Sequence, residues 1–417
     1  MSTPARKTMK MEPSTTPQWN PIPSLPYDLV LNCIARVSRL YYPTLSLVSK
    51  SFRSFIASPD LYKARSLLDQ TESCLYVCLN IFAIKSPRTI WFTLYPKPDK
   101  TLTNEQETIK KKKKLSEYVL AKVPIPYSFD ALYNSLVAVG SNIYNIGGSS
   151  LSSRAANPLY SSVSILDCTS HTWSVAPSLP VELNSLSATV VDQKIYVAGS
   201  YKLDQNISSD NSLDSISSSY VNSFHVLDTK TQIWDTLPIG TKDSLFNETL
   251  SIDGNFHVVT IKEAEGVAYD SNEGRWDVVG QWARFWRSSL GYCVIDKVLY
   301  SAITNSNEEE VKLKWYDIKV RDWRNLMGLV GLPKLPPYAQ VGLADYGGKM
   351  AVLWCDRTLP SMQKYGRYKN KRKIWCAEIA LEKRNTTCEI WGKVEWFDHM
   401  LTLDGGFDLI KVLAATV

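Results

Sequence analysis

Four histidines and eight cysteines are the side chains of this 417-residue chain with the widest chemical reach, because imidazole and thiolate act as bases, nucleophiles and metal ligands. Their spacing fits none of those roles: no Cys-x-x-Cys pair occurs, and the histidines share no ligand-like interval. No GxSxG, HExxH or phosphate-binding loop is present either. We therefore expect a chain without enzyme activity, cofactor or metal, whose thiols are reduced and structural.

Charged clusters are the next candidates. A basic run at 110–114 fits a nuclear localisation signal or a nucleic-acid patch as well as a solvated loop, which we favour. A second basic stretch, at 357–373, interleaves its charges with tyrosines and contains no acid. Because the whole chain is nearly balanced, with 47 basic and 41 acidic residues, we expect protein contact here rather than nucleic-acid binding. The candidate substrate-binding residues are Glu308, Glu309, Glu310, Lys364, Arg367, Tyr368, Lys369, Lys371 and Arg372.

An aspartate and a tryptophan six positions later recur in four places. Each aspartate follows Leu or Tyr at the end of an apolar run, and the residues between the pair are polar, as in DTKTQIW. This pattern predicts a hairpin in which the aspartate caps the turn and the tryptophan packs on the returning strand. The four pairs are Asp167 and Trp173, Asp228 and Trp234, Asp270 and Trp276, and Asp317 and Trp323.

Two further apolar runs precede each hairpin, as in LVAVGS and IYNIGG before the first one. A degenerate fifth copy extends the series, so that successive hairpin tryptophans lie 61, 42, 47 and 68 residues apart, ending at Trp391. Short β-branched and aromatic runs at a period of about 50 residues are typical of propeller blades, each a four-stranded antiparallel sheet.

The two ends of the β-rich region are predicted to complete one more blade. Residues 74–123 supply only three good strands, whereas the C-terminal DLIKVLAATV at 408–417 alternates like an innermost strand. An open ring would leave unpaired sheet edges, which proteins avoid. We therefore predict a mainly β fold in residues 71–417, a six-bladed propeller closed by the C-terminal strand.

Ahead of the propeller, the sequence favours a small all-α domain at residues 21–70, after a polar tail at 1–20 that we expect to be disordered. Apolar residues recur at steps of three and four from Leu29 to Val37, Pro43 stands where a second helix begins, and Pro59 opens a third. Three short helices bury little surface alone. We expect a partner or a neighbouring domain to complete this unit.

Particular residues in both regions resemble known repeats. The helical segment resembles an F-box on Leu25-Pro26-x-Asp28-Leu29, Ile34-Ala35-Arg36-Val37, Pro43, Leu45, Val48-Ser49-Lys50 and Phe52-Arg53. Gly147-Gly148 after a second strand, and the Asp-x5-Trp hairpins, resemble kelch repeats. Together, over residues 21–417, the chain resembles the F-box/kelch-repeat proteins that are abundant in plants. Two departures are visible: only the first blade keeps both glycines, and Phe52 stands where many F-boxes have Trp.

The resemblance implies a non-catalytic, substrate-recognition subunit of an SCF (Skp–cullin–F-box) ubiquitin ligase. The F-box would dock a Skp-type adaptor and through it the cullin, while the propeller captures a target protein for ubiquitination. Neither nucleic acid nor membrane is implied as a partner. The adaptor-binding residues that it assigns are Leu25, Pro26, Asp28, Leu29, Ile34, Val37, Pro43, Leu45, Val48, Lys50 and Phe52.

Other readings stay open. The propeller would also suit a protein that binds a small molecule as a ligand sensor, or a non-catalytic scaffold, and the helices would also suit a cap packed on the propeller.

The N-terminus has no apolar core of signal-peptide length, and the longest apolar stretch, at 74–84, is far short of the roughly 20 residues that cross a bilayer. We therefore expect a soluble intracellular protein of the nucleus, the cytoplasm or both.

Most of the long insertions follow the second strand of a blade, at 149–162, 200–220, 305–310 and 357–373. In an antiparallel meander, connections of this type lie on one face of the ring, and the helical domain enters at the other. Loops carried by a rigid scaffold commonly bind partners. The sequence therefore predicts substrate recognition on the insertion face.

Overall fold

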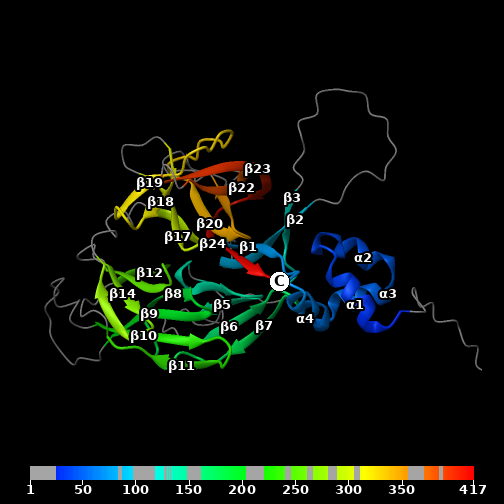
Figure 1. The fold of residues 1–417 in the computed structure, drawn as a ribbon, viewed down its shortest axis with the longest axis horizontal. Helices are drawn as coiled ribbons and strands as arrows, with labels where there is room; N and C mark the ends of the chain where they lie inside the picture. The colour runs from blue at the N-terminus through cyan, green and yellow to red at the C-terminus, as the bar shows by residue number, and fades with distance from the viewer. Residues whose placement is uncertain are drawn as a thin grey trace, which may run out of the picture. The chain divides into compact units, whose positions relative to one another are not determined.

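A computed structural model describes most of the chain, and it divides into two compact units, residues 1–70 and 71–417. The described residues are 25–82, 87–96, 118–125, 129, 131, 133–147, 161–202, 220–239, 246–260, 266–279, 289–304, 310–355, 371–384 and 388–417. The first unit is helical, and the second consists of strands with one short 3-10 helix among its described residues, η2 (Tyr133–Ser135) (Figure 1).

The helical unit holds four short α-helices and one 3-10 turn around a small apolar core. The core includes Ile34, Ala35, Tyr42 and Leu61, all nearly free of solvent contact. Buried Arg65 closes this core, because its Nη1 donates to the carbonyl oxygens of Ala35 at 3.1 Å and Val37 at 2.7 Å, where the first helix ends. The elements are α1 (Tyr27–Ala35), η1 (Arg39–Tyr41), α2 (Tyr42–Val48), α3 (Lys50–Ala57) and α4 (Pro59–Leu67).

The single helix expected after Pro43 is two helices. Ser49 has extended backbone angles, and its hydroxyl oxygen accepts a hydrogen bond from the backbone N–H of Phe52 at 3.2 Å. Ser58 caps α4 in the same way, through the N–H of Asp60. A serine N-cap satisfies one of the otherwise unpaired N–H groups of a new helix, so the periodicity that runs through Ser49 conceals a break.

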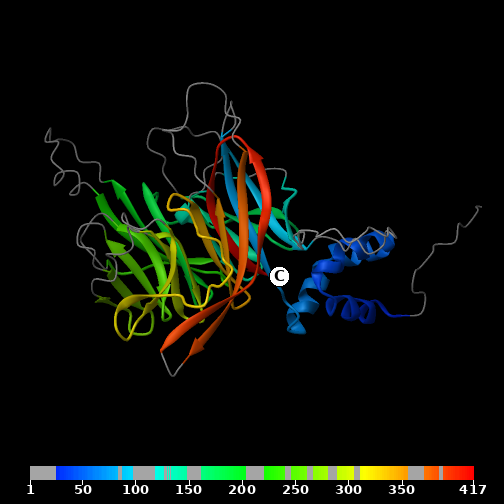
Figure 2. The ribbon, with the colours of Figure 1, turned by 90° about the horizontal axis from the view of Figure 1, so that it is seen from above.

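The second unit is a propeller of six four-stranded antiparallel sheets, as the repeats predicted (Figures 1 and 2). Blades 1 to 5 follow the chain in order. Their strands are β4 (Leu136–Val139), β5 (Asn142–Ile146), β6 (Val163–Asp167) and β7 (Thr172–Ala176); β8 (Ser185–Val191), β9 (Lys194–Lys202), β10 (Tyr220–Asp228) and β11 (Ile233–Thr236); β12 (Phe246–Ile252), β13 (Asn255–Thr260), β14 (Gly266–Asp270) and β15 (Arg275–Val278); β16 (Ser289–Ile295), β17 (Val298–Ile303), β18 (Lys312–Asp317) and β19 (Asp322–Asn325); β20 (Gln340–Tyr346), β21 (Lys349–Cys355), β22 (Lys371–Arg384) and β23 (Glu389–Asp404).

Blade 6 joins the two ends of the propeller, which confirms the predicted closure. Its strands are β24 (Phe407–Thr416), β1 (Ser73–Phe82), β2 (Pro87–Pro96) and β3 (Tyr118–Lys122), in that order. β24 runs antiparallel to β1 from the Ser73–Thr416 pair to the Ile81–Phe407 pair, with one irregularity after Cys78. Backbone hydrogen bonds in both directions between Glu72 and Val417 extend the pairing beyond the strands. The C-terminal strand therefore holds the ring shut.

The Asp-x5-Trp hairpins form as predicted. In each turn the aspartate carboxylate accepts a hydrogen bond from the backbone N–H two positions later, at 2.8 Å for Asp167 and 2.9 Å for Asp228. Two of the tryptophans also make a hydrogen bond between blades that the sequence did not reveal. Nε1 of Trp234 donates to the Pro177 carbonyl at 2.8 Å, and Trp276 bonds Pro238 in the same way. Each of these rings therefore ties its blade to the chain that leaves the preceding blade.

Candidate functional site

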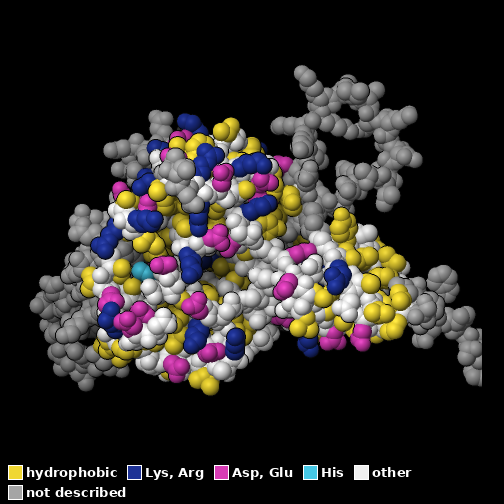
Figure 3. Space-filling view, viewed as in Figure 1, with side chains coloured by type: hydrophobic (Ala, Val, Ile, Leu, Met, Phe, Trp, Pro, Cys, Tyr) yellow, Lys and Arg dark blue, Asp and Glu magenta, His cyan; other side chains and the backbone are white. Residues whose placement is uncertain are grey.

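Large apolar side chains lie exposed on the helical unit, and Figure 3 shows them gathered over its surface. Leu47 and Val48 are 78% and 62% exposed, while Leu25 and Leu29 are each about half exposed. A patch of this kind on a unit with so small a core is typical of a surface that binds another protein. The exposed apolar residues are Leu25, Tyr27, Leu29, Tyr41, Leu47, Val48 and Leu67.

The structure divides the predicted adaptor-binding residues into three groups. Ile34 lies in the core, so it can support the surface but cannot contact a partner directly. Val37, Leu45 and Phe52 are partly buried against the same core. The exposed members are Leu25, Pro26, Asp28, Leu29, Pro43, Val48 and Lys50.

Tyr27, Tyr41 and Leu47 were missed by sequence reasoning. A signal for Leu47 was present, because Leu47 and Val48 are adjacent on one short helix and successive helical positions point about 100° apart. Both side chains cannot face one small core. A pair of large apolar neighbours on such a helix therefore indicates a surface that is itself apolar.

The predicted substrate-binding residues of the propeller lie mostly outside the described residues: Glu308, Glu309, Lys364, Arg367, Tyr368 and Lys369. Lys371 is exposed at the start of β22. Arg372 is buried instead: its guanidinium donates to the Phe407 carbonyl and lies 4.2 Å from the centroid of the Phe407 ring. Successive side chains of a strand point to opposite faces, so Arg372 points inward where Lys371 points outward. Arg372 therefore links blade 5 to β24, and its buried side chain is not available as a substrate-binding residue.

The long insertions share one topological position. They join the second strand of a blade to the third, from β5 to β6, β9 to β10, β17 to β18, and β21 to β22. The chain enters the propeller at Ser73, at the end of β1 that pairs with Thr416 and lies opposite its connection to β2. Within the propeller, the insertions and the entry of the chain therefore belong to opposite edges of the blades.

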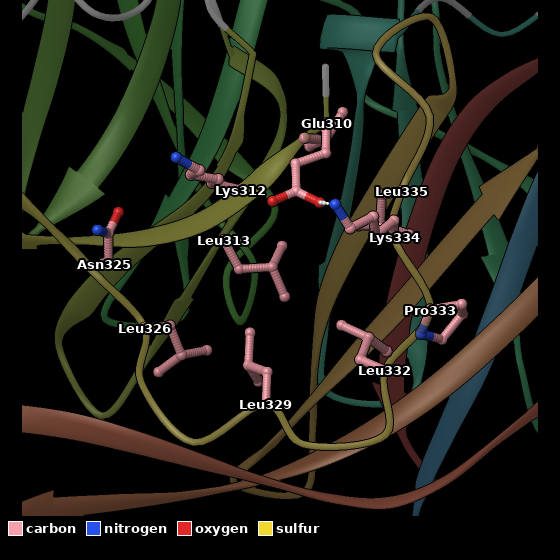
Figure 4. Close-up of a pocket in the computed structure, with 11 residues that line it drawn as sticks. Glu310, Lys312, Leu313, Asn325, Leu326, Leu329, Leu332, Pro333, Lys334 and Leu335 are labelled. Carbon is pink, nitrogen blue, oxygen red and sulfur yellow. Dashed lines mark ion pairs between the residues drawn. The ribbon is translucent and has the colours of Figure 1, made fainter. Parts of the chain in front are cut away.

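Glu310 borders a cavity of about 210 Å³ where blade 4 leads into blade 5 (Figure 4). We call it the blade 4–5 cleft. Leucine side chains point into it, and Glu310 and Lys334 face each other beside it, with carboxylate oxygen and Nζ 3.3 Å apart. The lining residues come from the start of β18, the end of β19 and the connection to β20: Glu310, Val311, Lys312, Leu313, Asn325, Leu326, Leu329, Leu332, Pro333, Lys334 and Leu335.

Backbone contacts hold the connection that forms one wall of this cleft. Val311 N–H donates to the Leu335 carbonyl at 2.9 Å, and Met327 exchanges hydrogen bonds with Ile390 and Gly392 of the long strand β23 (Figure 2). Gly328 has a φ of +76°, and a Cβ there would come within 2.7 Å of the Trp391 ring. The wall is therefore a fixed part of the blade 4–5 junction.

A second polar group lies among the innermost strands. Nζ of Lys411, on β24, sits 4.3 Å from the ring centroid of Tyr133 and 5.0 Å from that of Tyr292, on β16. Burial lowers the pKa of Lys411, and Glu248 on β12 partly offsets this, while burial raises the pKa of Tyr292. Segments far apart in the sequence meet here, which is why no local pattern revealed the cluster. It couples the closing strand to three other blades.

Five of the eight cysteines and two of the four histidines are buried in the described part of the chain. No group of three His, Cys, Asp or Glu side chains among them is placed to hold a metal ion. Burial lowers the pKa of His257 to about 4 and raises that of the Cys376 thiol to about 12, so both stay uncharged at neutral pH. Across the ranges that the structure describes, no helix is both long and apolar enough to cross a bilayer.

Comparison with known proteins assigns both units. Residues 22–64 match the F-box domain family, and residues 91–401 match the family described as FKB95, Kelch-repeats domain. The F-box/kelch-repeat protein At5g51250 of Arabidopsis thaliana is 53% identical over 397 residues, covering 94% of this chain and all of that protein. The putative F-box/kelch-repeat protein At5g38680 of the same plant is 47% identical over 407 residues, covering 97% of this chain and 98% of that protein. The solved structure of YjhT aligns with 65% of this chain and 99% of its own at 10% identity and a TM-score of 0.36, too low to support a conclusion. The chain belongs to the F-box/kelch-repeat family.

Proposed function

We propose that this chain is the substrate-recognition subunit of an SCF ubiquitin ligase. Its helical unit binds a Skp-type adaptor, and through it the cullin, while its propeller captures a target protein. The exposed apolar surface of the helical unit is the observation that carries this proposal, because such a surface is costly to leave in water. Family membership supports the same role.

The mechanism that follows is proximity. A target protein held on the propeller presents its lysines close to a conjugating enzyme that carries ubiquitin. Ubiquitin transfer then changes from a bimolecular step into a nearly unimolecular one. The chain's own residues bind and orient, and the covalent chemistry belongs to other subunits. A protein in this role works in the nucleus or the cytoplasm, where cysteine thiols, of which this chain has eight, stay reduced.

Adaptor binding tests the proposal directly. Replacing both Leu25 and Leu29 with Ala removes two half-exposed side chains, at about 2 kcal/mol or more of binding free energy each if they are anchors. We expect loss of a co-expressed Skp-type adaptor from the purified chain, with an unchanged melting profile. The matched control is Ile318→Ala with Val320→Ala, two apolar side chains of similar exposure on the propeller. Normal adaptor binding by the Leu25/Leu29 variant would contradict the proposal.

A further inference from the structure

The size of the blade 4–5 cleft limits what can occupy it. Sites for drug-sized small molecules usually enclose roughly 300–1,000 Å³. This cavity measures about 210 Å³, and its floor consists of leucine side chains, among them Leu313, Leu326 and Leu329. A space of this size and character suits one large aliphatic or aromatic side chain of a protein.

The cleft is also built before any ligand arrives. One wall is fixed through the Val311–Leu335 hydrogen bond, and the other through Leu326 N–H, which donates to the Leu313 carbonyl at 2.9 Å. Met327 ties the connecting segment to blade 5 through Ile390 and Gly392. Little ordering is needed on binding, so a single anchor side chain can contribute most of its transfer free energy.

The charged side chains at the mouth of the cleft favour certain residues next to the apolar side chain of the target that enters it. The described lining residues include the ammonium groups of Lys312 and Lys334 and the carboxylate of Glu310. The Lys334 side chain is 84% exposed, so its pair with Glu310 contributes about 1 kcal/mol at most and can be exchanged for another. A carboxylate next to the anchor would meet Lys334 without burying a charge.

We propose that the propeller recognises its target protein at the blade 4–5 cleft. The cleft binds one large apolar side chain of the target, in an extended segment where that side chain is flanked by Asp or Glu. The proposal rests on the substrate-capture function above and specifies its chemistry. The cleft lies where β18 begins and β19 ends, at the edge of blade 4 from which the β17–β18 insertion also departs. Its position therefore agrees with recognition on the insertion face.

Fluorescence anisotropy on the full-length chain tests this with four labelled peptides of equal length. One carries a single central Leu flanked by Asp and Glu, one the same Leu flanked by Ser, one the same Leu flanked by Lys, and one a central Ala flanked by Asp and Glu. We expect affinity to fall in the order acidic, neutral, basic, and to drop about tenfold or more when the acidic peptide has Ala in place of Leu. No Leu-dependent binding up to about millimolar peptide would overturn the proposal.

Variants assign the binding to the cleft. Lys334→Glu should weaken the acidic peptide about tenfold and leave the neutral one nearly unchanged, whereas Lys319→Glu, at the other end of the same hairpin, should change neither. Leu329→Trp or Leu332→Trp should fill the cavity and abolish binding of every Leu peptide, with melting temperature as the check on folding. Unchanged binding by both folded tryptophan variants would refute the site, and a preference for Lys-flanked peptides would refute the predicted charge. Cleft variants should keep adaptor binding, and the Leu25/Leu29 variant should keep peptide binding, so this proposal and the proposed function can fail separately.

Discussion

The two units of this chain differ in the share of their large apolar side chains that they bury. The propeller buries most of them in clusters between and within blades, such as the one that joins Val341 and Val352 to Trp315 of the neighbouring blade. The helical unit has a small core and leaves Leu47 78% and Val48 62% exposed. Apolar burial drives folding, and an exposed apolar surface such as that of the helical unit is of the kind that partner proteins cover. The propeller, in contrast, completes its own core within a closed ring.

Breaking the completeness of the propeller should have the largest effect. Deleting residues 408–417 removes all of β24 except Phe407, leaves the edge of β1 that faces away from β2 unpaired, and exposes the core around Leu75 and Val77. Unpaired strand edges and exposed apolar surface lead to aggregation. We expect an insoluble or rapidly proteolysed protein, measured by soluble yield and trypsin digestion. A control lacking residues 1–20 should behave as the full chain does. A truncated protein that melts at the normal temperature would show that the sixth blade does not depend on its shared strand.

The helical unit offers a sharper test, because two apolar residues close in the sequence have opposite environments. Ile34→Ala empties part of the core and should cost about 2–5 kcal/mol of stability, whereas Leu47→Ala should cost less than about 0.5 kcal/mol. The order reverses for binding: Leu47→Ala should weaken adaptor binding about tenfold or more if Leu47 is an anchor. Hydrogen exchange across 27–67, as a function of urea, measures the stability of this unit within the full chain. If Leu47→Ala loosens the unit as much as Ile34→Ala, its exposed apolar surface belongs to the fold and not to an interface.

The same contrast explains how far the sequence could be followed. Blade number, ring closure and the aspartate turns were all predictable, because each depends on a pattern that repeats or on an edge that has to be paired. The burial of Arg372 and the meeting of Lys411 with Tyr133 were not predictable in this way. Each depends on which distant segment lies opposite one particular side chain. The cleft escaped prediction for the same reason, since its walls unite two strands with a connection that has no repeat counterpart in the sequence.

The smallest of the three predicted effects is a difference between the two units in how their stability responds to acid. All four histidines lie in the propeller, and burial of His257 on β13 lowers its pKa to about 4, although the Ile252 carbonyl and Asp253 partly oppose the shift. A histidine in the unfolded chain has a pKa near 6.5, so between about pH 6.5 and pH 4 the unfolded chain binds a proton at this position that the folded chain does not. The free energy of unfolding of the propeller should therefore fall as the pH drops through that window, by about 3 kcal/mol at most. Burial also lowers the pKa of His225, so this residue acts in the same direction. Hydrogen exchange at pH 7 and pH 4.5 should show the loss in blade 3 of the normal chain, a smaller loss in His257→Gln, and no matching loss in α1 to α4. Equal acid sensitivity of the normal chain and His257→Gln would mean that burial of this imidazole does not govern the acid response of the propeller.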